Sequence, residues 1–160
     1  MAQDAMTFVS KSVDLLSRHQ AYMESARLLT RSLHESSDLL LSFLSVWAGL
    51  EIFVNKNFKQ HEERIFGRLS SDDSPLVPPA VTKRIRDVMS DKYRLTDKFS
   101  VIAAELYSND LEADIATFQS LKVFRDKLLH GEDVPLDSLP SEEARKLLRK
   151  YLKGHLEIPH

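Results

Sequence analysis

Apolar residues recur at helical spacing along most of this chain. Between Phe8 and His34 they fall three or four positions apart, which predicts an amphipathic helix. The next stretch, from Leu39 to about Phe58 or a little beyond, is apolar on almost every face. A helix of that kind belongs in the middle of a bundle, because each of its sides must be covered. Ser36-Ser37-Asp38 supplies the polar residues that cap its start.

The second half of the chain predicts shorter helices separated by turn-forming residues. They are expected at 80–89, at 96–107, from Asn109-Asp110 to His130, and from Ser141 onward. Acidic residues open the last of these helices and basic residues follow, which suits the helix dipole. No segment alternates apolar and polar residues as a strand would. We therefore expect an all-α fold, an up-and-down bundle of four to five main helices.

A single domain spanning 1–160 is expected, because a chain of 160 residues can bury one substantial core. Residues 68–79 are polar and proline-bearing, which predicts a mobile loop, and 155–160 are expected to fray. The N-terminus lacks the basic and apolar segments of a secretory signal. The apolar stretch 39–54 is shorter than the roughly 20 residues that a membrane span needs. A cytoplasmic protein without membrane contact is therefore predicted.

The composition of the chain excludes several classes of binding and catalytic site. A formal net charge of −2 excludes a generic polycationic nucleic-acid binder, although a local basic patch is compatible with it. The absence of cysteine excludes disulfides, thiolate zinc sites and cysteine nucleophiles. The six histidines show no recognised metal-ligand spacing, and there is no glycine-rich phosphate loop. We expect no metal and no cofactor.

The most informative stretch is Arg125-Asp126-Lys127-Leu128-Leu129-His130, followed by Gly131. Arg125 falls inside the apolar stripe of its predicted helix, where an unpaired charge costs several kcal/mol or more. Glu51, the only charge in the apolar stretch 39–54, is the obvious partner. In one interpretation Arg125 simply pairs with Glu51, and His130 is a favourable cation at the end of a helix.

A chemical role for these residues has a geometric condition. Arg125 and His130 are five positions apart, about 140° beyond a full turn, so an ideal helix does not place them on one face. Either the helix breaks at Gly131, in a left-handed C′ conformation that lets the imidazole swing back, or two subunits supply the groups together. Asp126 precedes His130 by four positions and can orient its ring.

The segment from Phe124 to Gly131 resembles the R-x4–6-H signature of HEPN domains, in which a polar residue such as Asn, Asp or His follows the arginine. Trp47-Ala48-Gly49-Leu50-Glu51 is similar to the aromatic-Leu-Glu pattern of several HEPN families. The likeness is closest to stand-alone bacterial members related to defence and toxin–antitoxin proteins. Lys127 departs from the pattern, which often has an apolar residue inside the motif.

The resemblance carries expectations about fold and function. HEPN domains are helical bundles that commonly dimerise and bring two Arg/His pairs into one groove; many are metal-independent endoribonucleases. It implies that Arg125 and His130 are catalytic and that Asp126 supports them; Glu51, as the expected partner of Arg125, is placed in the same supporting role. Lys122 and Lys127 are candidate contacts to an RNA backbone, with a solvent-facing Lys127 as the alternative. The partners implied are RNA, a second copy of the chain, and an antitoxin or defence protein.

In that reaction the RNA 2′-OH attacks its own phosphate, His130 transfers protons and Arg125 binds phosphate oxygens. Two alternatives stay open: a catalytically silent HEPN module that binds RNA or a partner, and a purely structural helical subunit. Two basic clusters are also present, of which the second is interpreted mainly as a solvated helix face. The first is Lys83, Arg84, Arg86, Lys92 and Arg94, and the second is Arg145, Lys146, Arg149, Lys150 and Lys153.

Overall fold

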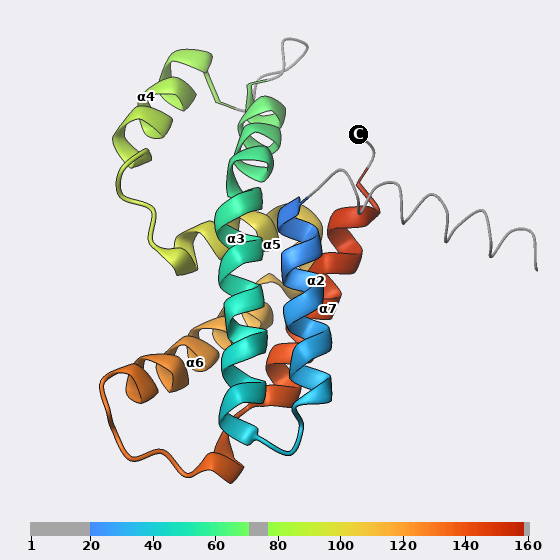
Figure 1. Ribbon diagram of the computed structural model, residues 1–160. Helices are drawn as coiled ribbons and strands as arrows, with labels where there is room; N and C mark the ends of the chain where they lie inside the picture. Colours follow the sequence, from blue (N-terminus) through green and yellow to red (C-terminus); the bar gives the residue numbers. More distant parts are fainter. Residues whose placement is uncertain (1–19, 71–76, 159–160) are drawn as a thin grey trace, which may run out of the picture. The chain divides into compact units, whose positions relative to one another are not determined.

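The computed structural model describes residues 20–70 and 77–158. Within these residues the chain forms six α-helices and no strand, so the fold is an all-α helical bundle, as predicted (Figure 1). Two short 3-10 turns, η1 (Ser108–Asp110) and η2 (Leu136–Ser138), lie between helices. The helices are α2 (Gln20–His34), α3 (Leu39–Leu69), α4 (Pro79–Met89), α5 (Leu95–Leu106), α6 (Leu111–Leu129) and α7 (Ser141–Leu156).

The chain forms two compact units. The first contains the described residues up to Phe53 together with those from Ser120 onward, and the second contains Val54–Gln119. The helices α3 and α6 therefore each contribute one part to either unit. The expected single domain over 1–160 stays a prediction.

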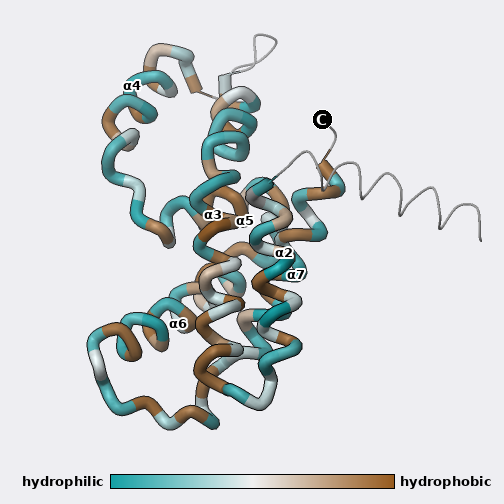
Figure 2. The backbone as a smooth tube through the Cα atoms, in the orientation of Figure 1, coloured by the Kyte–Doolittle hydropathy of each residue, from teal (hydrophilic) through white to brown (hydrophobic). Residues whose placement is uncertain are grey.

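In the first unit α2, the N-terminal half of α3 and α7 pack against one another at Gly49. A Cβ atom at Gly49 would lie 2.8 Å from Leu148 Cδ2 on α7 and 3.3 Å from the carbonyl oxygen of Ser25 on α2. Only a residue without a side chain allows three helices to approach so closely. Five apolar side chains of α3 in this unit are at most 2% exposed; they are Phe43, Val46, Trp47, Leu50 and Phe53. Figure 2 shows how hydrophobic positions, coloured brown, recur along this helix.

Arg145 ties α7 to the α2–α3 hairpin. Its side chain donates hydrogen bonds to the Ser42 hydroxyl at 2.9 Å and the Ser32 hydroxyl at 3.2 Å, and two of its nitrogens contact one oxygen of Glu142. The Ser42 hydroxyl donates in turn to the Ser32 carbonyl oxygen at 2.8 Å. The expected cationic face of α7 therefore needs a correction, because Arg145 is turned into the protein and only 14% exposed.

The C-terminal tail is more ordered than expected. Fraying was predicted for 155–160, but α7 continues to Leu156. The reason is burial: His155 is 1% exposed, lies edge-on to the Phe53 ring at 5.7 Å and stacks on Tyr22 at 6.4 Å. Residues 159–160 lie outside the described part of the chain.

The second unit has an aromatic centre beside a buried charged cluster. Phe99 on α5 stacks on Phe118 on α6 with ring centres 4.2 Å apart. Next to α5, the His61 imidazole of α3 contacts the Glu105 carboxylate, which also faces Arg64 at 3.7 Å and Arg68 at 3.4 Å. Both His61 and Glu105 are buried, so the arginines and the imidazole replace the water that the carboxylate has lost.

The helix α3 is longer than predicted, because its buried face continues into the second unit. Phe58, His61 and Glu62 are all buried beyond the expected end. By length and composition α3 could cross a membrane, but half of its most apolar stretch is buried inside the protein, and the core helix of a soluble protein meets the same criterion.

The loop predicted at 68–79 is shortened at its start, since α3 runs to Leu69. Its central residues, 71–76, lie outside the described part of the chain. The other predicted helices agree with the structure to within about one residue where both their ends can be compared. Residues 8–19, which were predicted to begin the first helix, also lie outside the described residues.

The packing at Gly49 predicts an unusual response to alanine. Gly49→Ala should lower the free energy of unfolding by up to about 2 kcal/mol, because overpacking of about 1–3 kcal/mol exceeds the gain in helix propensity of about 1 kcal/mol. Gly67→Ala is the matched control in the same helix, since no side chain or neighbouring helix of the described residues lies within 4 Å of its would-be Cβ. It should stabilise by about 1 kcal/mol. Denaturant unfolding measures both; equal stabilisation would show that Leu148 moves aside freely.

Buried His61 predicts a loss of stability at mildly acidic pH. Burial lowers the pKa of His61 below its usual value, and the hydrogen bond that its ring donates to the Glu105 carboxylate opposes this only in part. Below about pH 6.5 the unfolded chain therefore binds a proton that the folded chain resists, so stability falls as the pH falls through this range. His61→Gln should flatten the fall between about pH 6.5 and 5. The control His34→Gln removes an exposed histidine of α2, and an identical effect of the two variants would contradict the prediction.

Candidate functional site

The candidate site begins with the way α6 ends. Gly131 has a positive φ of 72°. The Gly131 N–H donates to the Leu128 carbonyl oxygen at 3.2 Å, and the Glu132 N–H donates to the Lys127 carbonyl oxygen at 3.0 Å. These two bonds form a Schellman motif, which caps the last turn of α6. The helix break predicted at Gly131 is therefore confirmed.

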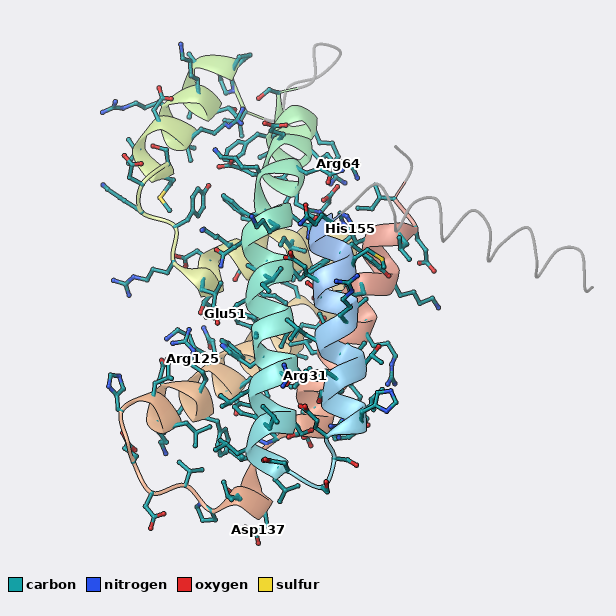
Figure 3. All side chains as sticks on the ribbon, viewed as in Figure 1. Arg31, Glu51, Arg64, Arg125, Asp137 and His155 are labelled. Atoms are coloured by element: carbon teal, nitrogen blue, oxygen red, sulfur yellow. The ribbon has the colours of Figure 1, made fainter. Side chains whose placement is uncertain are left out.

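Arg125 lies one turn before this break and has two carboxylate partners. Its Nη2 group pairs with Glu51 on α3, and its Nη1 group donates to Asp126 at 2.7 Å (Figure 3). The guanidinium carbon also lies 5.5 Å from the centre of the Trp47 ring, within the range of a cation–π contact. The Arg125–Glu51 pair inferred from the sequence is confirmed.

This arrangement keeps Arg125 at an open edge of the first unit. The side chain of Arg125 is 22% exposed and that of Glu51 is 33% exposed. Both border a hollow of about 260 Å³, whose other walls are Leu44, Trp47, Ala48 and Leu129. Leu129 is 68% exposed, a high value for a leucine beside a charged site. A phosphate oxygen or a carboxylate from another molecule can therefore reach the guanidinium.

His130 occupies the cap position and is exposed. Its backbone N–H donates to the Asp126 carbonyl oxygen at 2.9 Å, and its side-chain charge is among those that act on the Asp126 carboxylate. The described contacts of Arg125 are with Glu51, Asp126 and Trp47, and His130 is not one of them. In a single chain the Arg125 guanidinium and the His130 imidazole therefore both belong to the end of α6 but do not contact each other.

Asp126 connects most of the charges at the site. The Lys122 ammonium donates to its carboxylate from one turn earlier, at 2.5 Å. This bond, with the nearby charges of Lys122, Arg125 and His130, holds the pKa of Asp126 below its usual value. Lys122, which was expected to contact an RNA backbone, thus already has an acidic partner, while Lys127 is exposed.

Sequence reasoning missed the role of Trp47. In the sequence it stands out only as part of the aromatic-Leu-Glu pattern; in the structure it is 2% exposed, and its ring borders the hollow and faces Arg125. The available signal was its position four residues before Glu51 on a helix, which places both side chains on one face. Leu44, one turn earlier, follows from the same spacing.

No group of three or more acidic or histidine side chains within the described residues is arranged to hold a metal ion. The side chains around the end of α6 offer a guanidinium, an imidazole, ammonium groups and carboxylates. They allow phosphate binding and proton transfer near neutral pH. Comparisons with protein-family models, with curated proteins and with solved structures each find no match.

The Lys122 bond predicts a titration shift at Asp126. Lys122→Met should raise the pKa of Asp126, because the hydrogen bond and charge that stabilise its ionised form are lost. The carboxyl carbon signal of Asp126, followed by NMR across acidic pH, measures the change. Lys127→Met is the control, since it removes the same charge from an exposed position next to Asp126. Equal shifts in both variants would assign the effect to long-range charge and refute the role of the bond.

Proposed function

We propose that this protein is a metal-independent endoribonuclease of the HEPN type. The observation that carries the proposal is the end of α6, which the Schellman turn at Gly131 caps: an arginine beside an open hollow, an exposed histidine at the cap, and an acid between them in sequence. These are the positions of the R-x4-H resemblance. A cytoplasmic role in phage defence or in a toxin–antitoxin pair belongs to the proposal through that resemblance alone.

The reaction needs two proton transfers and stabilisation of charge on phosphorus. The 2′-oxygen of RNA forms a bond to the adjacent phosphorus while the bond from phosphorus to the 5′-oxygen breaks. A neutral imidazole of His130 takes the proton of the 2′-OH, and a protonated imidazole donates one to the leaving 5′-oxygen. Arg125 binds the phosphate oxygens as their charge grows. The products carry a 2′,3′-cyclic phosphate and a 5′-OH.

The proposal includes a homodimer. One His130 cannot be both neutral and protonated in the same step, whereas two copies supply one imidazole for each role. Arg125 and His130 of a single chain are not in contact with each other. A two-fold arrangement of α6 ends would bring a second pair to the same phosphate, and the exposed Leu129 beside the hollow offers apolar surface for it.

One observation favours the silent module as a second candidate. Arg125 is already paired with Glu51 and Asp126, so its charge is compensated without any ligand. A site that serves only to hold α6 against α3 would have the same contacts. In that case the protein would bind RNA or a partner protein without cleaving it.

The test is cleavage of a structured RNA by the purified protein in EDTA, with the ends of the products analysed. We expect 2′,3′-cyclic phosphate ends, and a loss of at least about 100-fold in rate for His130→Ala, the usual size of a general acid–base contribution. His130 is exposed, so the variant should keep its fold and its unfolding midpoint. An all-DNA version of the substrate should not be cut, because it lacks the 2′-OH.

The matched control is His34→Ala, which removes another exposed histidine at a helix end and should cleave as fast as the wild type. RNA binding without cleavage by any of the proteins would refute the ribonuclease and leave the silent module. Cleavage that survives in His130→Ala would point to a contaminating nuclease or another site.

A further inference from the structure

The helix α4 presents its charged side to α3 and its apolar side to the exterior. Val81, Ile85 and Val88, which share one side of the helix, are 40–47% exposed. The opposite side carries Thr82 and Lys83 and borders a cleft against α3. Amphipathic helices normally bury the apolar stripe. The polar side of α4 therefore lines the cleft, whereas an amphipathic helix usually packs its apolar side against its neighbour.

The cleft lies wholly within the second unit and has a volume of about 510 Å³, which is in the range of small-ligand sites. Its floor is the last two turns of α3, where the space opens over Gly67: among residues 20–70 and 77–158, and apart from the helix's own backbone, no atom lies within 4 Å of a Cβ built at that residue. The neighbouring Phe66 adds an aromatic ring to the wall, and the Arg86 guanidinium carbon lies 5.4 Å from the centre of that ring.

Two kinds of polar group surround this space. Lys83 and Arg86 are cations on α4, and Ser70 and Thr82 contribute hydroxyls. The Ser70 hydroxyl is buried and has no hydrogen-bond partner within the described residues. A buried hydroxyl without a partner is costly, so an acceptor placed in the cleft would satisfy it. Cations together with hydroxyl donors are the groups that bind phosphate oxygens.

The cleft also contains two carboxylates, Glu63 and Asp87. A purely anionic ligand would not suit them, because like charges repel in a confined site. They accept hydrogen bonds readily, and the hydroxyls of a ribose are donors of the right kind. A ligand that carries both a phosphate and sugar hydroxyls matches the full set of groups.

We propose that the cleft between α3 and α4 binds a ribonucleotide phosphate, with Lys83, Arg86 and Ser70 at the phosphate and Glu63 and Asp87 at the ribose. The ligand can be a free nucleotide or one nucleotide of an RNA chain, since both present the same chemistry. The site is separate from the residues of the proposed cleavage reaction, so it goes beyond that function and does not need it.

The experiment measures binding of two probes, adenosine 5′-monophosphate and a short fluorescent oligoadenylate RNA, by calorimetry and fluorescence anisotropy in EDTA. All proteins carry His130→Ala, so that cleavage cannot affect the result. Arg86→Gln should weaken binding by about 10-fold or more, as expected for a charge-assisted hydrogen bond. Arg84→Gln is the matched control: the same charge is lost two residues away, at an exposed position that does not line the cleft. It should change affinity by less than about 3-fold, because it removes only a screened charge.

A second variant tests whether binding requires the open volume of the cleft. Gly67→Leu fills the cleft from a helical position with no close neighbour, so it should abolish binding without lowering the unfolding midpoint. Competition of the RNA by the monophosphate would identify a free nucleotide as sufficient; binding of the RNA alone would identify a nucleotide within a chain, and both results support the cleft. Deoxyadenylate probes should bind more weakly in either case, since the carboxylates lose a hydroxyl partner.

The inference is overturned if neither probe binds, or if Arg84→Gln and Arg86→Gln weaken binding equally while Gly67→Leu has no effect. Equal weakening by the two arginine variants, with no effect of Gly67→Leu, would indicate general attraction between a basic surface and a polyanion. Because the readout is binding by a protein that lacks His130, a failure here says nothing about cleavage. Conversely, a protein that never cleaves RNA can still bind through this cleft.

Discussion

The constraint on which the structure depends is the need to cover α3. This helix is apolar on almost every side over its first five turns, so other helices must cover it. In the first unit α2 and α7 cover it, and their approach is close enough that Gly49 must lack a side chain. In the second unit the same helix continues, and three of its residues, Phe58, His61 and Glu62, are buried there. Each unit is built on one part of α3.

Covering α3 brings charged residues toward the interior, and the structure compensates each of them in the same way. Arg145 meets two serine hydroxyls and Glu142; the Glu105 carboxylate meets the His61 ring and two arginines; Arg125 meets Glu51 and Asp126. An isolated charge at any of these positions would cost several kcal/mol. The cleft beside α4 is different, because its Lys83, Glu63 and Asp87 form no ion pair with one another in the part of the chain described here.

The sequence pattern predicted the elements well, because apolar periodicity, capping residues and Gly131 all act locally. It also predicted the Arg125–Glu51 pair, since a lone charge in each of two apolar stripes leaves little choice of partner. It did not predict the inward turn of Arg145, the burial of His155 or the exposure of the apolar side of α4. Each of these depends on which neighbour a side chain meets in space, and a single helix pattern contains no such information. The ends of α3 and α7 were misjudged for the same reason, because tertiary burial continues them past their polar residues.

The electrostatics of the α6 end connect the structure to the proposed chemistry. Arg125 and Lys122 contribute two positive charges and Glu51 and Asp126 two negative ones, so these four groups sum to zero. The described carboxylate bonds occupy one N–H on each terminal nitrogen of Arg125, and a guanidinium has five N–H donors, so donors remain for a phosphate. A phosphate approaching this neutral set gains little long-range attraction. A protonated His130 at the helix cap makes the set net positive, and a second copy of the chain would add its own. Under the proposed reaction a protonated imidazole would therefore serve twice, as a positive charge beside the bound phosphate and as the proton donor to the leaving oxygen.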